Sequence, residues 1–374
     1  NGTAADYTVT VSPVADVFFS SQAPAMCGST TLNIINNSNV TGASFAWTAA
    51  GSSPDISGYG PGTGNAIAQT VINSGFNIGT VTYTVTPSIN GCPGTPSIIV
   101  LTVYPLPFTT LTLCNDPVTT VNSRPVTLRG GIPLGGTFSG PGVTGNLFFP
   151  GAAGPGNHLI TYTATNSFGC AKSAALTLSV LPVAPFTCGN TLTDVRDNRQ
   201  YATVQIGAQC WMAENLSYGT VINSSVAQRD NCVVENYCSG DNPVNCNTQG
   251  GFYQWDELMH YSAVDGDQGI CPPGWHVPSE TEWTTLFDSF GPRDKAIAGL
   301  NLKSSGTSGF LADLFGFSGF NRSWNHTGFA AMFWSSTGIG RFKAWAHGMN
   351  TPDDGVSTYP GFRANAFSLR CIRD

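Results

Sequence analysis

The stretch GTVTYTVTPSINGCPGTPSIIVLTVYPLP, residues 79–107, decides the fold of the N-terminal half of the chain. Its first segment alternates Val81, Tyr83 and Val85 with threonines, so apolar side chains occupy one face of an extended strand. An Asn-Gly pair at 90–91 marks a turn, and a second alternating segment follows it. This pattern is typical of a β-hairpin with one buried face.

The same plan recurs further along the chain, where LITYTATN repeats the alternation with Ile160, Tyr162 and Ala164. Residues 14–105 and 106–185 each consist of short alternating segments separated by Gly, Pro and Asn turns. The sequence therefore predicts two tandem immunoglobulin-like β-sandwiches. A chain with only 10% charged residues, 44 glycines and 24 prolines fits a mostly β extracellular protein.

The cysteines indicate an oxidising compartment, since the 11 cysteines form no zinc-type CxxC pairs. The shared hairpin plan of the two sandwiches predicts the disulfides Cys27–Cys92 and Cys114–Cys170. Each would stabilise its domain by about 4 kcal/mol by restricting the unfolded chain. The alternative is that these cysteines are buried free thiols. The odd total leaves one thiol over unless it pairs between chains.

Residues 79–107, together with GGTFSGPGVTG and HLITYTATNSFGC, carry a family resemblance. They resemble the polycystic-kidney-disease-like (PKD-like), immunoglobulin-like repeats of giant secreted proteins in the Bacteroidota. The resemblance implies spacers or stalks on the bacterial cell surface, without catalysis. The linkers PLP (105–107) and LPVAP (181–185) are short and stiffened by proline, which suggests a semi-rigid rod.

Residues 1–13 resemble the last strand of another repeat, with Tyr7, Val9 and Val11 on one face. A single strand cannot bury that face by itself. The strand is therefore either the end of a preceding repeat in a longer chain, or a donated strand that completes a sheet in another copy. Both sandwiches already have a final strand, so a donated strand would need another acceptor.

From Cys188 onward the character changes, and seven of the eight tryptophans follow residue 200. Four blocks resemble the Fibrobacter succinogenes major paralogous domain, and the resemblance covers 188–374. That family is similar to the C-type-lectin-like and formylglycine-generating-enzyme folds, which implies an α+β domain over 186–374. The blocks are CGNTLTDVRDNRQYATVQIGAQCWMAENLSYG, YCSGDNPVNCNTQGGFYQWDELMHY, GICPPGWHVPSETEWTTLF and FSLRCIRD.

One helix of this domain is visible in the residues themselves. Ser279 and Glu282 have the spacing of a capping box at a helix N-terminus. Trp283, Leu286 and the residues at 287 and 290 then fall on one apolar helical face.

The remaining cysteines belong to this domain. We pair Cys271 with Cys371, which ties the strand before the helix to the final strand, and Cys238 with Cys246 across a tight loop. Cys188–Cys210 is the remaining pair. Cys232 departs from the family pattern, and we expect it to be unpaired or intermolecular.

No catalytic constellation is evident in the sequence. The five histidines share no metal-ligand spacing, and neither a GxSxG motif nor a phosphate-binding glycine loop occurs. We therefore expect no enzymatic activity, no metal and no cofactor. A net charge of −7 without a basic cluster argues against nucleic-acid binding. The sequence contains no run of about 18 apolar residues, so we expect no membrane-spanning helix.

The resemblance to lectin-like folds implies that a long loop region, here roughly 292–362, carries the ligand. Its aromatic faces beside amides and carboxylates suit sugar recognition. The alternative is that the aromatic residues of MFWSST and RFKAWAHG are core strand residues. The adjacent acids at 353–354 offer hard oxygen ligands for calcium, or form a solvated turn. The candidate residues are Trp324, Asn325, His326, Asn350, Asp353 and Asp354.

These observations favour a secreted, non-enzymatic surface or adhesion protein. Two immunoglobulin-like stalk domains would present a lectin-like domain to a glycan or protein ligand on a surface. The alternative is a structural subunit of an extracellular filament, assembled from copies of this chain through the N-terminal strand.

Overall fold

The computed structural model describes residues 11, 13–20, 25–112, 114, 116–291, 295–351 and 355–374. The protein is mostly β, with 42% of residues in strands and 9% in helices. The chain divides into two compact units, each described here by itself. Unit 1 comprises residues 1–110, 132–136 and 163–173, and unit 2 comprises 111–131, 137–162 and 174–374. The boundaries that the sequence suggests at 13, 105 and 185 stay predictions.

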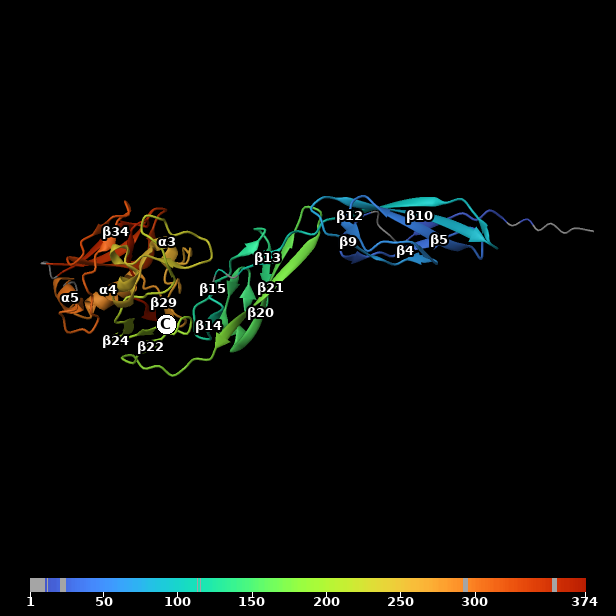
Figure 1. Cartoon of the computed structure of the whole chain (residues 1–374). Helices are drawn as coiled ribbons and strands as arrows, with labels where there is room; N and C mark the ends of the chain where they lie inside the picture. The colour runs from blue at the N-terminus through green and yellow to red at the C-terminus, as the bar shows by residue number, and fades with distance from the viewer. Residues whose placement is uncertain are drawn as a thin grey trace, which may run out of the picture. The chain divides into compact units, whose positions relative to one another are not determined.

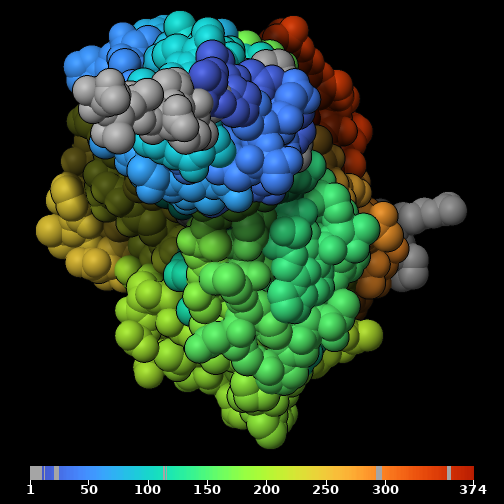
Figure 2. Space-filling model, turned by 90° about the vertical axis from the view of Figure 1, so that its right-hand side faces the viewer, coloured from blue at the N-terminus to red at the C-terminus, as the bar shows by residue number. Residues whose placement is uncertain are grey.

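The first sandwich, blue to cyan in Figures 1 and 2, has one large and two small sheets. The large sheet has the order β2-β12-β10-β5-β7, and β11 pairs with β10. Its strands are β2 (Ala25–Cys27), β5 (Ser44–Gly51), β7 (Gly62–Thr63), β10 (Gly79–Ile89), β11 (Cys92–Pro93) and β12 (Ser97–Tyr104). The small sheets are β1 (Phe18–Ser20), β4 (Ile34–Asn37) and β8 (Ala66–Ile67), and β3 (Thr30–Thr31), β9 (Thr70–Asn73) and β6 (Ile56–Ser57).

The alternation in the sequence sets the core of this sandwich. Along β10, Val81, Tyr83 and Val85 are fully buried, while the intervening threonines are only partly buried. Trp47 of β5 is also buried and lies opposite Val85. The predicted hairpin with one buried face is confirmed.

The predicted bond Cys27–Cys92 is wrong, since Cys27 is bonded to Cys170 and Cys92 is an exposed free thiol. In the β2–β12 pair Cys27 lies opposite Tyr104, the last residue of β12, whereas Cys92 precedes the start of that strand. An eight-residue strand spans roughly 23 Å, which is far beyond the reach of a disulfide. The hairpin tip at 163–173 belongs to unit 1, where Phe168 also stacks on Tyr104 with ring centroids 4.7 Å apart.

The second sandwich is built on the sheet β14-β21-β20-β17 and a smaller sheet β15-β19-β18. Ile160, Tyr162 and Ala164 of β20 are buried, as their alternation predicts. The elements are β13 (Thr110–Leu111), β14 (Val118–Thr120), β15 (Val126–Thr127), β16 (Gly131–Ile132), β17 (Thr137–Ser139), β18 (Val143–Thr144), β19 (Leu147–Phe148), α1 (Pro150–Ala153), β20 (Gly156–Thr165) and β21 (Ala171–Leu181).

The C-terminal domain centres on a seven-stranded sheet with the order β31-β30-β35-β32-β33-β34, to which β28 adds beside β35. These strands are β28 (Phe252–Gln254), β30 (Phe317–Ser318), β31 (Trp324–Asn325), β32 (Ala330–Ile339), β33 (Lys343–Asn350), β34 (Val356–Phe362) and β35 (Ala366–Ser368). The smaller sheets are β24 (Thr203–Ile206), β25 (Gln209–Met212), β36 (Ile372–Arg373) and β29 (Trp275–His276), then β22 (Leu192–Thr193) with β23 (Gln200–Tyr201), and β26 (Thr220–Val221) with β27 (Glu235–Asn236).

The helices are short, and the predicted capping box is present at the longest of them. Ser279 Oγ accepts a hydrogen bond from the Glu282 amide, while the Glu282 carboxylate accepts one from the Ser279 amide at 2.8 Å. Trp283 and Leu286 of this helix are fully buried. The helices are η1 (Ser239–Asp241), η2 (Pro243–Asn245), α2 (Cys246–Gln249), α3 (Trp255–Leu258), α4 (Glu280–Asp288) and α5 (Lys295–Leu302).

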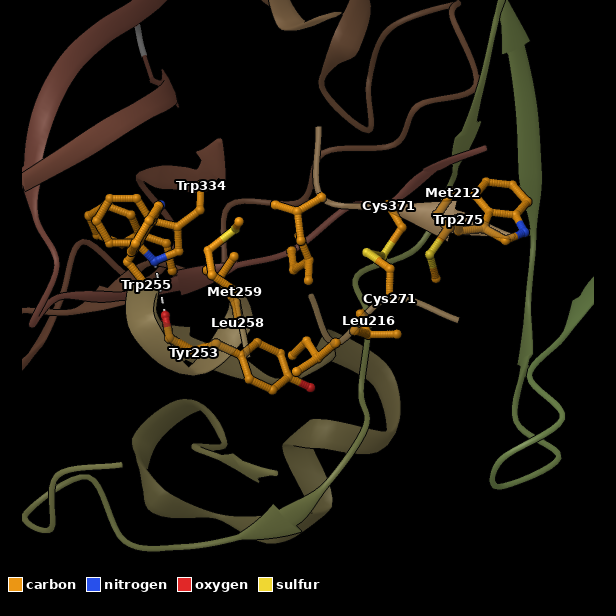
Figure 3. Close-up of a cluster of buried hydrophobic side chains, with 14 of the residues drawn as sticks. Met212, Leu216, Tyr253, Trp255, Leu258, Met259, Cys271, Trp275, Trp334 and Cys371 are labelled. Carbon is orange, nitrogen blue, oxygen red and sulfur yellow. Dashed lines mark hydrogen bonds between the residues drawn. A yellow bond between two sulfur atoms is a disulfide. The ribbon is translucent and has the colours of Figure 1, made fainter. Parts of the chain in front are cut away.

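The core of this domain contains aromatic side chains and a disulfide together (Figure 3). Trp255 and Trp334 are buried there, and the Trp334 indole donates a hydrogen bond of 2.9 Å to the Tyr253 carbonyl. The disulfide Cys271–Cys371 lies in the same cluster. Within the described residues, no helix is long and apolar enough to cross a membrane.

Three disulfides of the C-terminal domain join the cysteines that the sequence analysis pairs, namely Cys188–Cys210, Cys238–Cys246 and Cys271–Cys371. The prediction for the second sandwich is wrong, and so is the expectation of an unpaired Cys232. Cys114 bonds Cys232 of the C-terminal domain, and both residues belong to unit 2. The predicted partner, Cys170, is already bonded to Cys27 at the hairpin tip.

A buried arginine reinforces this junction inside unit 2. The side chain of Arg196 is almost fully buried and forms ion pairs with Asp194 at 2.6 Å and Asp116 at 2.8 Å. Its guanidinium also stacks 3.8 Å from the ring centroid of Tyr218, whose hydroxyl donates to Asp116. Because Asp116 precedes β14, the second sandwich and the C-terminal domain share one network of buried charges.

Candidate functional site

Two of the candidate ligand residues, Trp324 and Asn325, form strand β31 and make local contacts. Trp324 of β31 is half-buried and packs edge-on against Phe252, with ring centroids 5.1 Å apart. The amide of Asn325 donates to the Ser323 carbonyl. Trp324 and its neighbour are thus engaged in local structure.

His326 and Asn350 are brought together, because both line a cavity of about 420 Å³. The exposed ring of His326 stacks on Phe317 with centroids 5.5 Å apart. Phe329, also exposed, lines the same cavity. Asp353 and Asp354, with Tyr7 and Val9 of the N-terminal strand, lie outside the described residues, whereas Val11 is exposed. The binding roles of all these residues stay predictions.

A second cavity, of about 550 Å³, is the better-formed candidate, and the sequence analysis does not find it. Five separate chain segments converge on it, at 227–228, 254–261, 320–322, 341–342 and 362–364. We call it the aromatic–arginine pocket, after the lining residues Phe320, Phe342, Phe362, Arg322, Arg341 and Arg363.

The three phenylalanines expose unusually large apolar surfaces for residues of a folded domain. Phe320, Phe342 and Phe362 are 65%, 68% and 47% exposed, respectively. The rings of Phe320 and Phe362 meet at 61° with centroids 5.5 Å apart. Aromatic rings that are grouped and accessible in a concavity are characteristic of ligand sites.

Arg363 holds the wall of the pocket together. Its guanidinium stacks 3.8 Å from the ring centroid of the buried Trp255 and pairs with Asp256 at 3.1 Å. It also donates to the carbonyls of Gly340 at 3.1 Å and Lys343 at 3.3 Å. All three kinds of guanidinium nitrogen are therefore engaged, which makes Arg363 a structural support of the β32–β33 turn.

Gly338 has a packing reason to be glycine. A Cβ atom at this position would lie 2.7 Å from Arg363 Nη2 and 3.5 Å from the Trp255 ring. The missing side chain therefore makes room for the arginine–tryptophan stack beside the pocket.

Glu257 is the carboxyl group of the pocket whose pKa burial raises. The residue is 2% exposed, and its carboxylate accepts hydrogen bonds from the Tyr261 hydroxyl at 2.7 Å and the Glu235 amide at 2.8 Å. Burial raises the pKa of Glu257 to about 7, although these two hydrogen bonds partly oppose the shift. The group therefore gains and loses its proton near neutral pH.

One signal in the sequence marks this site. Three short segments combine phenylalanine with a basic residue, namely FNR (320–322), RFK (341–343) and FR (362–363). The two residues are adjacent in RFK and FR and are separated by one residue in FNR. Alternation assigns the neighbouring strands to the core, but it does not show that three turns converge in space.

Metal chemistry has no visible centre in the described residues. Within them, no group of three or more His, Cys, Asp or Glu side chains is placed to hold a metal ion. His276 instead lies between Asp374 at 2.7 Å and Glu282 at 2.9 Å. Burial opposes its protonation, but these two hydrogen bonds outweigh it and raise the pKa of His276.

Two family models match parts of the chain. The family model of the Fibrobacter succinogenes major domain matches residues 204–373, and that of a PKD-like domain matches residues 24–107. The matches confirm the resemblance of the C-terminal domain and the PKD-like resemblance of the first sandwich, while that of the second sandwich stays a prediction. The chain matches none of the curated proteins with which it was compared.

Solved structures that are similar to this chain include three bacterial adhesins. The adhesin InvE of Yersinia pseudotuberculosis is 11% identical with a TM-score of 0.21, over 96% of this chain and 97% of that one. A 1.5-MDa bacterial ice-binding adhesin is 12% identical with a TM-score of 0.18, over 50% of this chain and 78% of that one. A Ca²⁺-stabilised ice-binding adhesin of an Antarctic bacterium is 12% identical with a TM-score of 0.20, over 54% and 63%. Such scores support no argument about function.

Proposed function

We propose that this chain is an extracellular surface protein whose C-terminal domain binds a ligand through the aromatic–arginine pocket, while the sandwiches serve as its stalk. The observation that carries the proposal is the pocket itself, a cavity of about 550 Å³ with three exposed phenylalanines. Its volume lies in the usual range for small-molecule sites. The proposal assigns no bond-making step to the domain.

The covalent cross-links support the stalk and the compartment. Five disulfides are typical of an oxidising, extracellular environment. The bond Cys114–Cys232 and the buried pairs of Arg196 hold the second sandwich and the C-terminal domain together in unit 2. A binding domain fixed to its support transmits load without relying on a flexible linker. The PKD-like match at 24–107 is consistent with a spacer.

A binding assay with the whole chain tests this function. The 374-residue protein is applied to an array of neutral and acidic saccharides and to surfaces coated with mucin or collagen. We expect binding to at least one probe, and loss of that binding in the double variant Phe320→Ala/Phe362→Ala. Phe329→Ala is the matched control, because Phe329 is an equally exposed phenylalanine that lines the other cavity.

Two outcomes would contradict the proposal. The first is no binding to any probe, and the second is equal binding by the double variant. Binding that only Phe329→Ala abolishes would move the site to the cavity of His326 and Asn350. Concentration-dependent association of the chain with itself, measured by sedimentation, would favour the filament alternative.

A further inference from the structure

Basic residues are concentrated at the aromatic–arginine pocket. Between Lys303 and Arg370 the chain has four of them, at 322, 341, 343 and 363. Three line the pocket, and Lys343 lies 4.9 Å from the ring centroid of Phe362, which also lines it. In a chain with a net charge of −7, this is a local reversal of charge.

Two of the three arginines that line the pocket have no carboxylate partner among the described residues. Arg322 donates one hydrogen bond to the Ser225 carbonyl, and its other nitrogens remain available. Arg341 is exposed on the turn between β32 and β33 and forms no ion pair within the described part of the chain. By contrast, Arg363 is already paired with Asp256. Arg322 and Arg341 are thus the two guanidiniums free to receive an anion.

The acidic residues of the pocket do not cancel this charge. Asp256 is neutralised by Arg363, and Glu257 is buried behind hydrogen bonds from Tyr261 and Glu235. The concavity therefore combines a net positive charge with accessible aromatic faces. A guanidinium matches a planar carboxylate or a sulfate with two parallel hydrogen bonds.

Resting on the proposed function, we infer that the aromatic–arginine pocket selects saccharides that carry a carboxylate or a sulfate group. The apolar C–H face of a sugar ring fits against the rings of Phe320 and Phe362, and the acidic group fits Arg322 and Arg341. Three common modes of peptide recognition use a sheet edge, a helix groove or a proline-binding groove, which are elongated surfaces, whereas arginine clusters also bind acidic peptide motifs. A cavity closed by five converging segments instead suits one or a few sugar rings.

Titration of the whole chain with matched oligosaccharides tests this inference. The probes are a heparin-derived hexasaccharide for sulfate, oligogalacturonate for carboxylate, maltohexaose as the neutral sugar, and poly-L-glutamate as an acidic polypeptide. We expect one of the acidic saccharides to bind and maltohexaose not to bind. Each of Arg322→Gln and Arg341→Gln should weaken binding about ten-fold or more, since each removes a charge-assisted hydrogen bond. Lys172→Gln, which removes an exposed charge from the second sandwich, is the control and should bind as the parent does.

The outcomes separate this inference from the function on which it rests. If maltohexaose binds as well as the acidic probes, and the arginine variants match the control, selection of acidic sugars is refuted while the pocket remains a ligand site. If poly-L-glutamate binds with the same dependence on both arginines, the ligand class is acidic polypeptide and the inference fails. If no probe binds here or in the array assay, the proposed function fails as well. Affinity that falls as sodium chloride rises from 50 to 300 mM is also expected.

Discussion

Replacement of Glu257 by glutamine should abolish a large pH dependence of stability in the C-terminal domain. In the folded protein Glu257 keeps its proton up to about pH 7, compared with an ordinary pKa of 4.5. The folded state therefore binds more protons than the unfolded state between these values. The stabilisation linked to this proton is complete below pH 4.5 and is lost as the pH rises through 7.

The size of the effect follows from the shift. A difference of roughly 2.5 pKa units corresponds to about 3 kcal/mol of unfolding free energy, of which about 2.5 kcal/mol falls between pH 5 and pH 8.5. Glutamine keeps the shape of the side chain and the acceptor for the Glu235 amide, but it does not titrate. The unfolding free energy of Glu257→Gln relative to the parent should therefore rise by about 2.5 kcal/mol over this pH range.

Urea unfolding followed by tryptophan fluorescence measures this difference. Seven of the eight tryptophans follow residue 200, so the signal reports mainly on the C-terminal domain. Asp256→Asn is the matched control, because it removes a neighbouring carboxylate whose side chain is 51% exposed. If the difference between Glu257→Gln and the parent stays flat from pH 5 to 8.5, Glu257 is ionised in the folded protein and the argument from burial is refuted.

Three further changes test the junction, the helix cap and the disulfide pattern. Arg196→Met leaves the buried carboxylate of Asp194 and the partly buried one of Asp116 without their cation, and it should lower the unfolding free energy by roughly 3–5 kcal/mol in a urea titration. Ser279→Ala removes the acceptor for the N-terminus of α4 and should lower it by about 1 kcal/mol in the same titration. The native chain should react with one equivalent of a maleimide at Cys92, and Cys92→Ser should react with none.

Control variants and contradicting outcomes can be stated for these three predictions. Arg196→Lys keeps the charge and should restore part of the stability, whereas equal loss in both variants would point to packing alone. Thr284→Ala, a few residues along the same helix, is the control for Ser279→Ala, and equal effects would contradict the cap. Two or more reactive thiols in the folded chain would contradict at least one of the five disulfides.

Local patterns in the sequence carry much of the fold. Alternation around Tyr83 and Tyr162 predicts two hairpins with one buried face, and burial follows that alternation. The Ser279–Glu282 spacing predicts the start of α4. Such features depend on the strand and helix periods and on backbone hydrogen bonds within a few residues, so they can be read without knowing the tertiary structure.

The disulfides also differ in whether the sequence predicts them. Cys238–Cys246 closes an eight-residue separation, and both it and the bond from Cys271 to the final strand fit the family resemblance. The two wrong predictions, Cys27–Cys92 and Cys114–Cys170, were based on the similarity of the hairpins in the two sandwiches. That similarity does not show that Cys92 and Cys27 lie at opposite ends of β12, because strand direction and register are set by pairing between distant segments.

What the sequence by itself determined is the order of domains, the faces of the main strands, one helix and the two family resemblances. Only the tertiary structure decided which cysteines meet, that Arg196 joins two domains, and that three Phe–Arg turns form one pocket. Periodicity acts along the chain over a few residues, whereas disulfides, buried ion pairs and cavities join side chains that are far apart in the sequence, 143 positions in the case of Cys27–Cys170. Their positions are fixed only when the sheets have packed.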